Sequence, residues 1–123
     1  MKILQNILIC IIAFEHFYFL ILEMFLWTQP KGIKTFGLKS KAFAEETKVL
    51  AANQGLYNGF LAFGLVFSLV SKNIWMIYYL MVCIIIAGLY GAFSTKKLKL
   101  FYIQSIPPIF FLILEIINNH GSS

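Results

Sequence analysis

Two residue types that carry charge in most proteins, arginine and aspartate, are missing from this sequence. Its charges come from ten lysines and five glutamates, which leave a formal net charge of +5. The lysines gather beside apolar runs and form no basic stripe on a soluble face, so we expect no nucleic-acid binding. Lysines in such positions are typical of segments that set membrane orientation and contact lipid headgroups.

Cysteine is scarce too, with Cys10 and Cys83 each inside an apolar run. The sequence has no C-x-x-C pair, so neither a dithiol nor a zinc site is predicted. We expect both thiols to behave as small buried hydrophobes. A metal site built from Glu15, His16 and Glu23 is an alternative that we do not favour, and no cofactor is indicated.

What the sequence has in excess is apolar side chains. They make up 60% of the chain, against about 45–50% in soluble domains, and the mean hydropathy is +0.83. Their arrangement in long runs predicts an all-α fold, an integral membrane four-helix bundle. We expect residues 1–120 to form one membrane domain and 121–123 to be a linker remnant. The predicted spans are 3–27, 42–71, 74–94 and 98–119.

Short signals mark the ends of these spans. The first run continues to Trp27 with no small-residue cleavage site, so it is predicted to be a retained helix and not a signal peptide. Pro30 and Gly32 are expected to stop it, and Ser40 can cap the second helix. The Pro107-Pro108 pair predicts a kink in the fourth span.

The lysine distribution predicts an orientation. The N-terminus and the turn between the second and third spans carry two lysines, and the other side carries eight. The positive-inside rule therefore predicts cytoplasmic loops at 28–48 and 95–99. We expect a multi-pass protein of a bacterial inner membrane with both termini outside the cytoplasm.

Three of the five glutamates lie inside apolar runs. A carboxyl group at bilayer depth is costly unless it is paired, protonated or facing water, so each one is a functional-site hypothesis. Counting along the helices puts Glu15 near the bilayer centre and Glu23 about one turn from the cytoplasmic end. Glu115 falls near the outer face, where it is either functional or a snorkelling surface group.

Polar residues of the other three spans fall at about the level of Glu23 and predict a polar layer in the cytoplasmic half. His16 and Glu23, seven residues apart, share one stripe of the first helix, and Gln54 shares a face with Asn58. The layer is either a binding pocket or a set of interhelical hydrogen bonds. The candidate ligand-binding residues are Glu15, His16, Glu23, Asn53, Gln54, Tyr57, Asn58, Tyr90 and Gln104.

Small residues recur at helix-packing spacing. Gly55 and Gly59 form a G-x-x-x-G motif, and Gly88 and Gly91 each lie four residues from an alanine. Such spacing lets helix backbones approach closely, within one chain or between chains. Four short spans leave little room for an interior cavity. We therefore expect a homo-oligomer, with a trimer as one candidate, whose pocket lies between subunits.

Two blocks carry a family resemblance: E-H-F-Y-F-L and E-M-F-L-W within 15–27, and N-Q-G-L-Y-N-G-F-L at 53–61. G-x-Y-G at 88–91 and Q-x-x-P at 104–107 extend it. With these motifs, nearly the whole chain resembles the small bacterial membrane family called domain of unknown function 1304. The resemblance implies four membrane spans and assigns no activity.

The layout is also similar, more distantly, to the membrane-associated eicosanoid and glutathione metabolism superfamily. Its members have four spans and form trimers with a glutathione site between subunits. Of its second-helix pattern, Arg-x-x-x-Asn-x-x-Glu-x-x-Pro, only Asn53 is matched here. Val49, Leu56 and Gly59 occupy the other places, so the analogy transfers no catalytic residue.

Three functions fit the sequence. The first is an oligomer whose polar pocket binds or modifies a lipophilic or amphipathic small molecule, with Lys31, Lys34 and Lys39 available to an anionic group. The second is a proton-coupled transporter using Glu15, similar in outline to the small multidrug-resistance exporters. The third is a structural or accessory subunit of a membrane complex.

Overall fold

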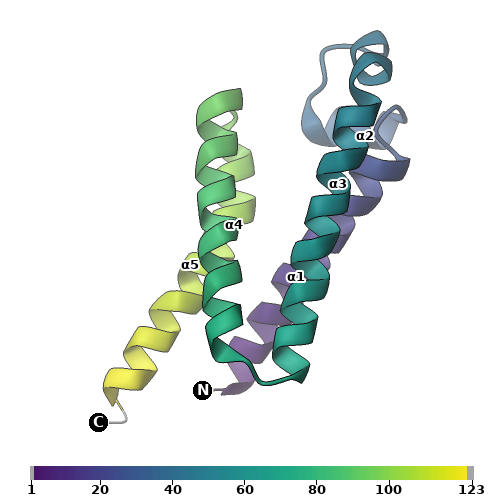
Figure 1. Cartoon of the computed structure of the whole chain (residues 1–123). Coiled ribbons are helices and arrows are strands. Elements are labelled where there is room, and N and C mark those ends of the chain that lie inside the picture. Colours follow the sequence, from purple (N-terminus) through teal and green to yellow (C-terminus); the bar gives the residue numbers. More distant parts are fainter. Residues whose placement is uncertain (1, 122–123) are drawn as a thin grey trace. The chain divides into compact units, whose positions relative to one another are not determined.

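The computed structural model describes residues 2–121, including all side chains in that range except those of Lys2 and Leu100. The described chain is helical and contains no strand (Figure 1). The predicted linker remnant falls mostly outside it, because only Gly121 is described and ends the last helix. The helices are α1 (Lys2–Phe25), α2 (Pro30–Phe36), α3 (Lys41–Val70), α4 (Ile74–Thr95) and α5 (Leu98–Gly121).

Four of these helices are long and apolar enough to cross a membrane, and by length and composition they suggest a multi-pass membrane protein. At 1.5 Å per residue, the 24 residues of α1 reach about 36 Å. The candidate spans are Ile3–Phe25, Lys41–Val70, Ile74–Thr95 and Phe101–Gly121.

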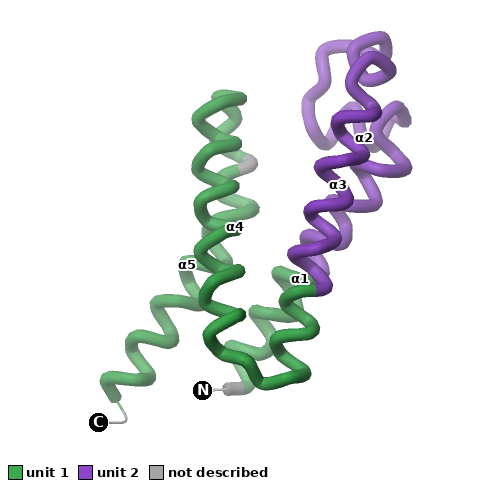
Figure 2. Tube along the Cα trace, viewed as in Figure 1, with its two compact units in different colours: residues 1–13, 64–123 green, residues 14–63 purple. Residues whose placement is uncertain are grey.

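The chain divides into two compact units (Figure 2). Residues 14–63 form one unit, which holds the end of α1, all of α2 and most of α3. Residues 1–13 and 64–123 form the other, which contains α4 and α5.

The connection between α1 and α3 is more ordered than the sequence suggested. Pro30 and Gly32 were expected only to end the first helix, but the seven-residue α2 begins at Pro30. Proline at the first helical position costs nothing, because its missing N–H would have no partner there. A side chain on Gly32 would collide with the carbonyl group of Leu26, so glycine is needed for α2 to pack on the end of α1.

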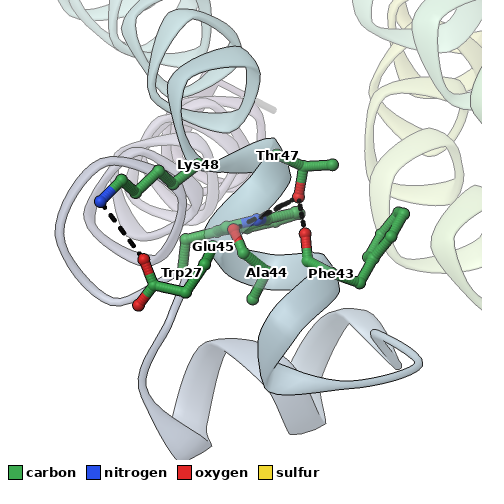
Figure 3. Close-up of polar contacts among 6 residues, drawn as sticks. All are labelled: Trp27, Phe43, Ala44, Glu45, Thr47 and Lys48. Carbon is green, nitrogen blue, oxygen red and sulfur yellow. Dashed lines mark hydrogen bonds and ion pairs between the residues drawn. The ribbon is translucent and has the colours of Figure 1, made fainter.

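Polar and aromatic contacts fix the same region. The Trp27 indole nitrogen donates to Thr47 Oγ1 at 2.9 Å (Figure 3), and its ring packs on Phe36 at 5.1 Å between centroids. Ser40 Oγ accepts from the backbone N–H of Phe43 at 3.0 Å, which confirms the predicted cap of α3. The contacts of Trp27 therefore join the end of α1 to both α2 and the first turns of α3.

The G-x-x-x-G motif of α3 packs within the chain. A Cβ on Gly55 would lie 2.7 Å from Met24 Cγ and 3.0 Å from Glu23 Cβ, both on α1. A Cβ on Gly59 would lie 2.5 Å from Leu20 Cδ1. These glycines permit a close approach of α3 to α1. The motif therefore serves packing within one chain, which was one of the two alternatives that the sequence left open.

In the second unit, α4 and α5 lie side by side (Figure 1). Gly88 of α4 lies against the Ser105 side chain of α5, and Ser105 Oγ donates to the carbonyl oxygen of Ile85 at 3.2 Å. Gly91, by contrast, faces open space. Pro107 and Pro108 lie inside α5, and the lower half of α5 in Figure 1 changes direction as the predicted kink requires.

The expectation that both cysteines are buried was wrong for Cys10. That thiol is exposed, and Cys83 is half-buried. The neighbouring Ile9 and Ile12 are buried, and at 100° per residue Cys10 points away from the side of α1 on which they lie. An apolar run in a membrane helix does not reveal which of its residues face protein and which face lipid.

Candidate functional site

The buried carboxyl group of Glu23 meets the side-chain amide of Asn58. Asn58 Nδ2 donates to Glu23 Oε1 at 2.5 Å, and Glu23 is only 4% exposed. Gly55 lies one turn before Asn58 on α3 and lets that helix approach Glu23 closely. Counting along the helices predicts that these two polar residues lie at one level, and the structure brings them together.

His16 lies on the same stripe of α1 as Glu23, as the seven-residue spacing predicted. It is fully buried, and its ring meets Phe19 edge to face at 5.6 Å. The same stripe continues toward the N-terminus through further buried residues. Its buried members are Gln5, Ile9, Ile12, His16 and Glu23.

Glu15 differs from Glu23 because part of it has no partner. The side chain is half-buried, and its Oε1 is buried without a hydrogen bond among the described residues. Eight residues separate the two glutamates, which turns Glu15 about 80° from Glu23 around α1. Glu15 therefore faces different surroundings from Glu23, in the middle of a span.

The remaining candidates on α3 point outward. Asn53, Gln54 and Tyr57 are exposed, with Tyr57 63% exposed. Tyr90 of α4 is exposed and Gln104 of α5 is half-buried. Because Tyr90 and Gln104 belong to the other compact unit, a single polar layer joining all four spans stays a prediction.

A second polar cluster, which the sequence analysis did not find, lies in the unit of residues 1–13 and 64–123. The Tyr78 hydroxyl donates to Glu115 Oε2 at 3.1 Å, and Asn118 Nδ2 donates to Gln5 Oε1 at 3.3 Å. Glu115 is 5% exposed, so the alternative of a snorkelling surface group was wrong. Gln5 Nε2 is buried and has no hydrogen-bond partner among the described residues.

One sequence signal for this cluster was available. Glu115, Asn118 and Asn119 are three and four residues apart, so one face of a helix presents all three. Tyr78 and Gln5 carried no comparable signal, because tyrosine near a span end is common at membrane interfaces and Gln5 is a single polar residue near the start of a span. Their meeting with α5 depends on tertiary packing.

Chemically, the carboxyl group of Glu23 has no cationic partner among the described residues. The partner of Glu23 is a neutral amide, and the lysine side chains of residues 14–63 are exposed, one of them in an ion pair between Lys48 Nζ and Glu45 Oε2 at 3.2 Å (Figure 3). Among the described residues, no three His, Cys, Asp or Glu side chains form a group able to hold a metal ion. The arrangement suits a group that donates hydrogen bonds or carries positive charge.

Comparisons with known proteins agree with the sequence resemblance. The family described as protein of unknown function (DUF1304) matches residues 10–116. The uncharacterized protein YpaA of Lactococcus lactis subsp. lactis (strain IL1403) is 31% identical over 100 residues, covering 79% of this chain and 84% of that protein. No solved structure gave a significant match.

Proposed function

The chain belongs to the DUF1304 family, and we propose that it binds a lipophilic or amphipathic small molecule at the polar part of α1, with the carboxyl group of Glu15 holding the polar end and Glu23 lying two turns further along the helix. Asn58 positions Glu23 in this proposal, and His16 extends the polar stripe. The proposal describes a binding site and assigns no chemical reaction.

The observation that carries the proposal is the unpaired oxygen of Glu15. A buried carboxyl oxygen without a hydrogen bond is unfavourable, and in the hydrocarbon region water is scarce. Glu15 Oε1 has no partner among the described residues. A bound molecule that donates a hydrogen bond there would remove the unfavourable contact.

The chemistry of the surroundings suggests the class of ligand. A carboxyl group without a nearby cation favours an amine or hydroxyl group at the polar end. Aromatic side chains one turn along α1 from Glu15 suit an apolar body: Tyr18 is 37% exposed and Phe19 is half-buried. We therefore favour an amphipathic amine or alcohol over an anion.

The same proposal includes self-association. Asn53 and Gln54 are exposed amides near the start of the apolar part of α3, and amides at this depth gain from partners on another helix. In an oligomer these residues and Tyr57 complete the pocket from a second copy. A trimer remains the candidate that the distant layout analogy favours.

Native mass spectrometry from a mild detergent tests the proposal. We expect an oligomer that carries a discrete additional mass, and we expect Glu15→Gln to lower its occupancy at least about tenfold, because a charge-assisted hydrogen bond is replaced by a weaker one. The matched control is Glu46→Gln, the same change at an exposed acid. A bare protein, or equal occupancy in both variants, would contradict the proposal.

Proton-coupled transport is a second candidate, favoured by the same unpaired oxygen in mid-span. A carboxyl group in that position can carry a proton across the membrane. The Glu15→Gln variant separates the two functions in proteoliposomes. Loss of proton-driven flux with unchanged ligand occupancy would favour transport over binding.

A further inference from the structure

We propose that four lysines at the junction of α1, α2 and α3 form a binding site for the headgroup of an anionic phospholipid. This basic collar consists of Lys31, Lys34, Lys39 and Lys41, all of them exposed. The site is separate from the carboxyl pocket proposed above and has the opposite charge.

The collar is free to meet a negative partner. Lys31, Lys34 and Lys41 have no ion-pair partner in the part of the chain that the structure describes. Lys39 Nζ lies 4.9 Å from the centre of the Phe43 ring, a contact that leaves its charge in place. Exposed ammonium groups without acidic partners attract phosphate as point charges.

The nearest acids do not neutralise these lysines. Glu45 pairs with Lys48 at 3.2 Å, one turn further along α3 (Figure 3), and Glu46 is exposed beside it. Across residues 28–48 there are five lysines and two glutamates, a formal charge of +3. The segment thus presents a concentrated positive charge next to a span.

The position of the collar matches the level of lipid headgroups. The candidate span of α1 ends at Phe25, and Trp27, a residue type enriched at membrane interfaces, follows two residues later. Lys31 and Lys34 are three apart in α2, so they share one face of that helix. A headgroup beside α1 therefore lies within reach of two ammonium groups at once.

The collar is held in place, which distinguishes it from a flexible basic loop. Gly32, between the two α2 lysines, packs so closely on the Leu26 carbonyl group that no side chain fits. Trp27 packs on Phe36 at the other end of α2 at 5.1 Å, and the Gly37 N–H caps α2 in the left-handed conformation. A fixed backbone beneath Lys31 and Lys34 lowers the ordering cost of binding a phosphate.

The test measures lipid retention by native mass spectrometry from nanodiscs that contain phosphatidylglycerol and phosphatidylcholine in equal amounts. Each lysine near an anionic surface contributes about fivefold in affinity. We therefore expect Lys31→Gln with Lys34→Gln to lower retention of phosphatidylglycerol about tenfold or more. Retention of phosphatidylcholine should not change.

The matched control is Lys97→Gln with Lys99→Gln, which removes the same charge at the start of α5. We expect it to lower phosphatidylglycerol retention several-fold less than the Lys31 and Lys34 pair does. An equal loss in both pairs would mean that net charge alone acts, and would overturn the proposed site. Lys31→Arg with Lys34→Arg should keep at least half of the retention. Displacement of the lipid by millimolar inorganic phosphate would identify a free-anion site and also overturn the proposal.

Discussion

At the scale of single residues, Glu23 relies on Asn58. The amide of Asn58 is the hydrogen-bond donor to this buried carboxyl group, so Asn58→Leu leaves a carboxyl oxygen unpaired in an apolar interior. We expect the free energy of unfolding to fall by about 1–3 kcal/mol. Reversible unfolding by sodium dodecyl sulfate in mixed micelles measures the change.

Two further variants show whether the hydrogen bond is the cause. Asn6→Leu makes the same change at an exposed position of α1, the helix that carries Glu23, and we expect it to alter the free energy of unfolding by less than about 0.5 kcal/mol. Glu23→Leu combined with Asn58→Leu removes both polar partners and should recover most of the loss. If the double variant is less stable than Asn58→Leu, the contact contributes through packing instead.

The residues of the Glu23 region could be predicted from the sequence, but most contacts could not. An acid inside an apolar run stands out by composition alone, and helical spacing correctly joined His16 to Glu23 on one buried stripe. The Tyr78–Glu115 pair was missed because residues 37 apart meet only when two helices adopt a particular rotation. When a helix is apolar on all sides, its hydrophobic periodicity does not reveal how the helix is rotated about its own axis.

At the scale of helices, the two glycines of the α3 motif are predicted to differ. A Cβ on Gly55 would press on Glu23 Cβ at 3.0 Å and on the Leu20 carbonyl oxygen at 3.2 Å, neither of which moves without the backbone of α1. We expect Gly55→Ala to destabilise the protein by about 1–3 kcal/mol. The same detergent unfolding experiment measures it.

Gly59→Ala is the matched comparison, because its Cβ would meet only the side chain of Leu20, which can rotate. We expect a change within about 1 kcal/mol. Gly91→Ala has nothing within 4 Å and should stabilise α4 by up to about 1 kcal/mol through helix propensity. Equal losses at Gly55 and Gly59 would contradict the packing described for α1 and α3.

The positions of the long helices were predictable to within a few residues at each end, because an apolar run long enough to cross a bilayer is itself the signal. The short helix α2 was not, since proline and glycine were interpreted as helix stops. Pro30 can start α2 because an N–H group in the first turn has no hydrogen-bond acceptor within the helix, so proline loses no hydrogen bond there. Gly32 is required by contact with Leu26, which lies outside α2 and could not be inferred from the local sequence.

At the scale of the whole molecule, four spans require both termini to lie on the same side of the membrane. Eight of ten lysines lie on the other side in this arrangement, and translocating them is unfavourable, so we predict that the termini are outside the cytoplasm. Alkaline phosphatase fused after Gly121 should be active in a bacterial host, and fused at Lys97 it should be inactive. Green fluorescent protein at these sites should give the opposite pattern.

The lysines themselves provide the control for this topology. Changing Lys31, Lys34, Lys39 and Lys41 to glutamine leaves four lysines on the predicted cytoplasmic side against two on the other. Because the bias falls from eight against two, we expect a mixed population in which both fusion sites show partial phosphatase activity. An unchanged single orientation would mean that features other than lysine balance orient the chain. Phosphatase activity at Lys97 in the unaltered protein would reverse the predicted topology, and the basic collar would then lie on the outer leaflet.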